Sequence, residues 1–196
     1  MMFRLTALLT LLLTANASYV NADFVDSFDV ENGGTGVLDY TNFENFVITA
    51  GSVDLLGNGF FDYYPGNGLY LDLNGTSGGS GSIETNFDIA PGLYRLSFNL
   101  GNNRDFAAEN MVTVSLDGYS ETFSRTGVVS LESIERLITV TSSSRLSFVT
   151  PSSDADLGGI VLDSVAVTSV PEPSSSVMLA ALAFSMFTWR RHAKRA

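Results

Sequence analysis

The chain has 196 residues, no cysteine, and 21 acidic against 10 basic side chains. Between Ser18 and Val170 the balance is five arginines to 20 carboxylates, a formal charge of −15, and this stretch contains no His, Lys or Trp. Such a surface repels nucleic acid and anionic lipid. The missing residue types also exclude disulfides, a cysteine or Ser–His nucleophile, a lysine Schiff base and a histidine zinc site from this stretch.

Residues 1–22 have the layout of a secretory signal peptide. Arg4 supplies the positive start, residues 5–13 form a short apolar run, and Ala15-Asn16-Ala17 places small residues where signal peptidase needs them. We expect cleavage after this triplet, with a site after Ala22 as the second choice. A permanent N-terminal anchor is the alternative, which the short apolar run disfavours because it is too short to span a bilayer.

Residues 23–169 alternate apolar and polar side chains over short runs that turn residues separate. The clearest run, 93–100, is apolar at every second position, which predicts a half-buried strand. We expect further strands at 111–116, 137–141, 146–149 and 160–167. The domain is therefore predicted to be all-β, a two-sheet antiparallel jelly-roll sandwich. A solenoid is the alternative, but no repeat of fixed length is present.

Asp163 stands inside the last of these apolar strands, and the apolar face switches at Asp163-Ser164, which predicts a β-bulge. A carboxylate in such a place needs a cation or several hydrogen bonds. Calcium takes roughly six to eight oxygen ligands, and Asp26, Asp29 and Glu31 lie near the start of the domain. We expect a structural calcium ion held by Asp163 and one or more of Asp26, Asp29 and Glu31. The alternative is that Asp163 bonds only backbone amides at the bulge.

Residues 60–66 carry four aromatic rings in a segment bounded by Gly and Pro. Aromatic rings beside polar groups suit the apolar faces of sugars, so Phe61, Tyr63 and Tyr64 are candidate ligand-binding residues. The alternative is that two of the four rings point into the core and the others line a loop. No two of the 20 carboxylates stand out as the pair of a glycosidase, so we expect no enzyme, with a glycan hydrolase as the lesser alternative.

The C-terminus combines three features in a fixed order. A Pro-Glu-Pro motif comes first, an apolar segment from Val177 to Trp189 follows, and a basic cluster ends the chain. The motif residues are Val170, Pro171, Glu172 and Pro173, and the basic residues are Arg190, Arg191, Lys194 and Arg195. The apolar segment predicts a short transmembrane helix, although its 13 residues span only about 20 Å. The basic cluster would stay in the cytoplasm and stop translocation.

This arrangement, residues 170–196, resembles the PEP-CTERM sorting signal of Gram-negative bacteria. The resemblance implies that exosortase, a membrane-embedded enzyme, cuts near the motif and releases the protein to the surface or the extracellular matrix. Phrases within the domain resemble galactose-binding-like domains: Gly51–Leu55, Gly66–Gly75, Pro91–Tyr94 and Gly159–Val165. That second resemblance implies a jelly roll of a class that binds sugars, often beside a structural calcium ion.

These features together predict an exported protein, first an inner-membrane precursor and then a component of the cell surface or biofilm matrix of a Gram-negative bacterium. We expect a structural or polysaccharide-associated role, and a carbohydrate-binding module with a calcium ion is the alternative. The expected partners are signal peptidase, the Sec translocon, exosortase and extracellular polysaccharide. The membrane is a partner only through the C-terminal segment, and nucleic acid is not a partner.

Overall fold

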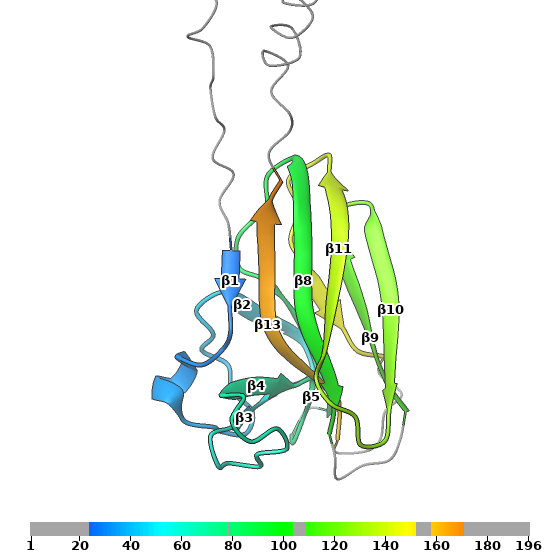
Figure 1. Cartoon of the computed structure of the whole chain (residues 1–196). Coiled ribbons are helices and arrows are strands. Elements are labelled where there is room, and N and C mark those ends of the chain that lie inside the picture. Colours follow the sequence, from blue (N-terminus) through cyan, green and yellow to red (C-terminus); the bar gives the residue numbers. More distant parts are fainter. Residues whose placement is uncertain (1–23, 78, 104–108, 152–157, 171–196) are drawn as a thin grey trace, which may run out of the picture. The chain divides into compact units, whose positions relative to one another are not determined.

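Two antiparallel β-sheets pack face to face in the computed structural model (Figure 1). The structure describes residues 24–77, 79–103, 109–151 and 158–170, which all fall within one compact unit, Asn21–Val170. The predicted signal peptide, 1–22, and the sorting region beyond Val170 lie outside the described residues.

The first sheet has the strand order β11-β8-β13-β4-β3, and β1 also pairs with β13. β1 pairs with the C-terminal half of β13 and β4 with its N-terminal half, while β8 runs along the other edge. The strand bounds are β1 Phe24–Asp26, β3 Asp54–Gly57, β4 Leu69–Asp72, β8 Gly92–Asn102, β11 Glu132–Val140 and β13 Ile160–Ser169.

The second sheet has the order β10-β9-β12-β7-β2. Its strands are β2 Phe46–Ala50, β7 Ser82–Thr85, β9 Glu109–Leu116, β10 Tyr119–Thr126 and β12 Ser147–Val149. A separate two-stranded ladder joins β5 Asn74–Gly75 to β6 Gly79–Ser80, and a 3₁₀ turn, η1, covers Glu31–Gly34.

The strand pairs are nested, which means that each pair encloses the previous one in the sequence, and this pattern identifies a jelly roll. β9 pairs with β10, β8 with β11, β7 with β12 and β1 with β13, and successive pairs alternate between the two sheets. The chain therefore winds around its core as a long double ribbon. The predicted all-β, two-sheet antiparallel jelly-roll sandwich is confirmed.

The period-two runs direct one set of side chains into the space between the sheets. In β8 the predicted inner face is buried: Tyr94, Leu96, Phe98 and Leu100. The ring of Phe148 on β12 meets Phe98 edge to face at 5.5 Å and Phe46 on β2 at 6.4 Å. This aromatic contact joins both sheets, so the core is one continuous cluster across the sandwich.

The predicted bulge in the last strand is also confirmed. The register of β13 against β8 shifts between Asp163 and Ala166, and Ser164 has a φ of 52°. Asp163 itself is buried, at 2% exposure. It lies between the stretch of β13 that pairs with β4 and the stretch that pairs with β1.

Candidate functional site

The predicted aromatic segment forms the connection between β3 and β4. Gly57 and Phe60 exchange two backbone hydrogen bonds of 2.9 and 3.0 Å, and the amide of Gly59 donates to Asp62 Oδ2 at 3.1 Å. Phe61 has a φ of 43°, which is unusual for a bulky residue. These contacts fix the turn that carries the aromatic rings.

The three predicted ligand-binding rings differ in exposure. Tyr64 is only 6% exposed; its hydroxyl donates to Asn102 O at 2.7 Å, and the ring packs in a second apolar cluster. Tyr63 is half-buried against the same cluster. Phe61 is 54% exposed and meets Phe60 edge to face at 4.9 Å. Tyr64 is therefore a core residue, and Phe61 is the most accessible of the three rings.

A shallow depression of about 320 Å³ lies beside this segment, lined by Pro65, Gly66, Asn67, Leu131 and Tyr64. Asn67 links it to the bulge in β13, because its Nδ2 donates to Asp163 Oδ2 at 2.7 Å. The other carboxylate oxygen of Asp163, Oδ1, is buried and accepts no hydrogen bond from any described residue. Burial is the main cause that raises the pKa of Asp163 above its usual range, and the nearby charge of Asp29 adds to it.

The other predicted calcium ligands are placed differently. Asp26 caps its own turn, with Oδ1 accepting from the amide of Phe28 at 2.8 Å and Oδ2 from Asn45. Glu31 accepts from the hydroxyl of Tyr40 at 3.1 Å and the amide of Glu44 at 2.9 Å. The structure thus brings Asp29 near Asp163, whereas Asp26 and Glu31 are committed to local hydrogen bonds. Among the described residues, no group of three or more acidic or histidine side chains is arranged to hold a metal ion.

Asp54 and Asp72 are directly opposite each other on β3 and β4, and both are buried. Asp54 accepts from the amide of Asp39 at 2.7 Å and from the hydroxyl of Thr76 at 2.8 Å. Asp72 accepts from the amide of Asn74 at 2.9 Å and from Asn103 Nδ2 at 2.7 Å. Because neither carboxylate is exposed and both hold backbone segments, this pair serves the fold and offers no general acid or base to a substrate.

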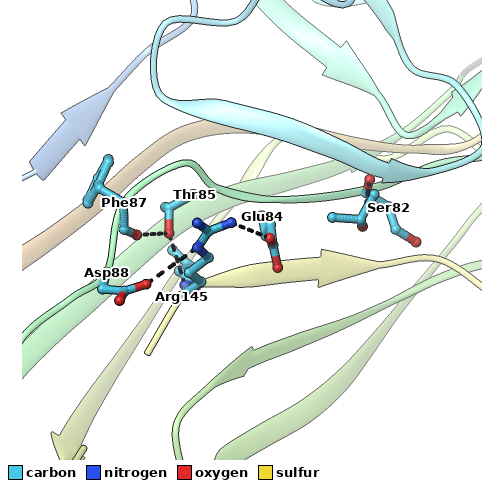
Figure 2. Close-up of polar contacts among 8 residues, drawn as sticks. Ser82, Glu84, Thr85, Phe87, Asp88 and Arg145 are labelled. Atoms are coloured by element: carbon cyan, nitrogen blue, oxygen red, sulfur yellow. Dashed lines mark hydrogen bonds and ion pairs between the residues drawn. The ribbon is translucent and has the colours of Figure 1, made fainter. Parts of the chain in front are cut away.

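The four arginines within the described residues are all paired with carboxylates. Arg95 contacts Glu135 and Arg125 contacts Glu132, while Arg136 binds Glu121 through two nitrogens. Arg145 lies between Glu84, at 2.6 Å, and Asp88, at 3.4 Å, as Figure 2 shows. No unpaired cation is therefore available in the described part of the domain to bind an anionic ligand.

The C-terminal region matches a known family model. Residues 169–192 match the PEP-CTERM protein-sorting motif. The chain carries a PEP-CTERM sorting signal. Such a signal marks an exported surface protein that exosortase sorts and that is anchored at its C-terminus before processing. This agrees with the expectation from residues 170–196. Its Pro-Glu-Pro residues and the apolar segment Val177–Trp189 lie outside the described residues, and the described residues include no helix long and apolar enough to cross a membrane.

Solved structures similar to this chain include carbohydrate-active proteins. One is a family 35 carbohydrate-binding module from Clostridium thermocellum, with 17% identity and a TM-score of 0.42 over 69% of this chain and 99% of that one. A second is the C. thermocellum xylanase 10B fragment with its CBM22-1 and GH10 modules, with 13% identity and a TM-score of 0.45 over 70% and 28%. No curated protein matches the chain.

An exo-β-1,3-galactanase from Phanerochaete chrysosporium is also similar, with 18% identity and a TM-score of 0.40 over 68% of this chain. This chain spans only 29% of that enzyme's length. Since all these TM-scores are below 0.5, the fold assignment rests on the nested strand pairing, and any function has to be argued from the protein's own residues.

One feature of the domain is not predicted by the sequence. A depression of about 410 Å³ opens between β1 and the connection from β7 to β8, with Phe24, Phe87 and Tyr94 in its lining. The sequence holds one signal for it: Asn86-Phe87-Asp88 places a ring between two polar residues just before the turn at Pro91-Gly92. An aromatic residue in a polar connection is a candidate for contact with a ligand.

Proposed function

We propose that this exported protein is a non-catalytic component of the cell surface or extracellular matrix of a Gram-negative bacterium, associated with extracellular polysaccharide. The observation that carries the proposal is the sorting motif at residues 169–192, joined to a domain whose described residues offer no assignable catalytic group. In this proposal, signal peptidase and the Sec translocon deliver the chain, and exosortase removes the tail.

The non-catalytic role is supported by how the described acidic and basic groups are used. The buried carboxylates Asp54 and Asp72 hold strands together, and the described arginines are neutralised by ion pairs. The stretch from Ser18 to Val170 has no His, Lys or Cys. A glycan hydrolase would need two accessible carboxylates on opposite sides of a bond, and no observation favours such a pair.

A direct test applies two assays to the processed protein, one for association with polysaccharide and one for hydrolysis. After export from a host that has exosortase, it should fractionate with the cell surface or matrix and sediment with extracellular polysaccharide purified from that host. Incubation with the same polysaccharide should release no reducing ends. Protein that stays entirely in the supernatant would contradict the association, and reducing ends above the buffer control would contradict the non-catalytic role.

We also propose that the domain holds one structural calcium ion at Asp163. The buried Oδ1 of Asp163, which accepts no hydrogen bond, and the nearby charge of Asp29 both fit a cation. Asp26 and Glu31 fit less well, because both carboxylate oxygens of each already accept hydrogen bonds. Within the described residues, Asp29 uses only Oδ1 in this way, to accept from the amide of Leu69 at 2.8 Å. Asp163 and Asp29, helped by backbone oxygens, are therefore the side chains we expect to hold the ion.

Calcium should raise the melting temperature of the processed protein, and a chelator should lower it again. An ion bound only by the folded state stabilises it by about 2.7 kcal/mol at a hundredfold excess over its dissociation constant. Asp163→Asn should remove most of the difference between calcium and chelator, whereas Asp62→Asn, a change in the nearby β3–β4 connection, should keep it. Identical melting curves of the wild-type protein in calcium and in chelator would exclude the ion.

A further inference from the structure

Aromatic rings line the depression beside β1. The rings of Phe24 and Phe87 meet edge to face at 5.1 Å, and the buried ring of Tyr94 also lines the space. Phe24 and Tyr94 are 8% and 1% exposed, whereas Phe87 is only half-buried. Phe87 is therefore the ring against which a ligand could stack. The volume of about 410 Å³ lies within the range of small-molecule sites.

The connection that carries Phe87 is held in place before any ligand arrives. Three hydrogen bonds tie residues 85–90 to other segments of the domain, and a fourth, inside the connection, holds Phe87 and is drawn in Figure 2. They run from Thr85 Oγ1 to Phe87 O (2.8 Å), Asn86 Nδ2 to Glu44 O (2.7 Å), Ile89 N to Ser144 O (2.8 Å) and Tyr94 OH to Ala90 O (3.0 Å). Binding would therefore cost little ordering of this wall.

The side-chain polar atoms left over in the lining are oxygens. Asn45 donates through Nδ2 to Asp26 at 3.1 Å, and its Oδ1 has no partner among the described residues. Asp88 accepts from Arg145 at 3.4 Å through Oδ1, and its Oδ2 has no partner among the described residues. Arg145 is itself bound at 2.6 Å to Glu84. A ligand that donates hydrogen bonds, and brings no negative charge, would match these oxygens.

These features select one class of ligand. An anion would face Asp88 with no unpaired described arginine to bind it, and a purely apolar ligand would leave the oxygens of Asn45 and Asp88 without water or a partner. A neutral pyranose has an apolar C–H face for Phe87 and hydroxyl groups that donate to the oxygens. We propose that this depression, between β1 and the β7–β8 connection, binds a neutral sugar unit of a glycan. The inference rests on the proposed polysaccharide association and adds its site and ligand class.

The test uses the exported, processed protein and three sets of oligosaccharides in a binding array. The sets are neutral gluco-, galacto-, manno- and xylo-oligosaccharides, anionic oligogalacturonates and cationic oligoglucosamines. The wild-type protein should bind at least one neutral set. Phe87→Ala should weaken that binding by at least about tenfold, or ~1.4 kcal/mol, and Phe87→Tyr should restore it. Ala90→Arg, a change at an exposed position of the lining, should block the site without disturbing the core.

Phe61→Ala serves as the matched control, because Phe61 is the exposed ring of the β3–β4 connection. Neutral-sugar binding that survives both Phe87→Ala and Ala90→Arg but is lost in Phe61→Ala would overturn this site and leave the proposed function intact. Binding of oligoglucosamine alone, abolished by Asp88→Asn, would identify a cation site and overturn the neutral-sugar assignment. If no oligosaccharide binds, the inference fails, and sedimentation with the polysaccharide decides the proposed function separately.

Discussion

Deletion of residues 177–195 should convert a surface- or matrix-bound protein into a freely periplasmic one. The deletion removes the predicted membrane stop and the segment that holds the precursor for exosortase, so the chain would pass through the translocon without being retained. Cell fractionation followed by immunoblotting of the periplasm, membrane and medium measures the change. The expected effect is a nearly complete redistribution, because retention depends on this one segment.

Glu172→Ala should have the opposite consequence and leave an uncut precursor in the membrane. Glu172 is the charged residue of the Pro-Glu-Pro strip, within the matched motif at residues 169–192. Its loss leaves the apolar segment and the basic cluster in place, so the chain is still held while recognition by exosortase is lost. Ser174→Ala, two residues further on, is the matched control and should be processed normally. Processing of the Glu172 variant at the normal rate would show that Pro-Glu-Pro is not the signal.

The parts of the fold that the sequence predicts are those with one face in the core and one in water. From Tyr94 to Leu100, β8 alternates buried side chains with more exposed ones, so its period can be read from the residues. Asp117-Gly118 marks the hairpin between β9 and β10, where Asp117 adopts a φ of 52°. The bulge at Asp163 can be predicted from the sequence, because a strand cannot change its inner face without an extra residue.

The first half of the domain gives a weaker signal for a physical reason. β3 and β4 are buried on both faces, so neither alternates, and each contains an aspartate that composition alone would place at the surface. Only the fold reveals that Asp54 and Asp72 face each other and are satisfied by Thr76 and Asn103. Loss of period-two alternation in doubly buried strands is the reason that these elements were not predicted.

The aromatic segment illustrates the same limit at the level of single residues. Phe61 and Tyr64 are three positions apart in one loop, yet one is 54% exposed and the other 6%. Phe61 has a left-handed φ of 43°, and Tyr64 donates a hydrogen bond to Asn102 at the end of β8 in the same sheet. Side-chain direction in such a loop depends on backbone geometry that residue types do not specify. Residue type alone predicts sugar binding by this segment, which stays a prediction, and it does not indicate which ring is accessible.

Between pH 4 and pH 7, the free energy of unfolding should fall as pH rises, and Asp72 should be the main cause. Burial raises the pKa of Asp72 to about 7, from an ordinary value of 3.8, although Asn103, Asn74 and Gly159 donate hydrogen bonds that oppose the change. Over this range the folded protein keeps a proton that the unfolded chain has released, so rising pH favours unfolding. The slope can reach about 1.4 kcal/mol per pH unit and should level off above pH 7.

Asp72→Asn isolates this contribution, because it removes the ionisable group and keeps an oxygen that can accept from the amide of Asn74. The variant should show a much shallower slope between pH 4 and pH 7, and above pH 7 it should be more stable relative to the wild type than at pH 4.5. Urea unfolding midpoints across this range measure both effects. Glu135→Gln, which removes an exposed carboxylate on β11, controls for the reduction in overall negative charge and should keep the wild-type slope. Equal slopes for all three proteins would mean that Asp72 stays ionised in the fold, with its three hydrogen-bond donors outweighing burial.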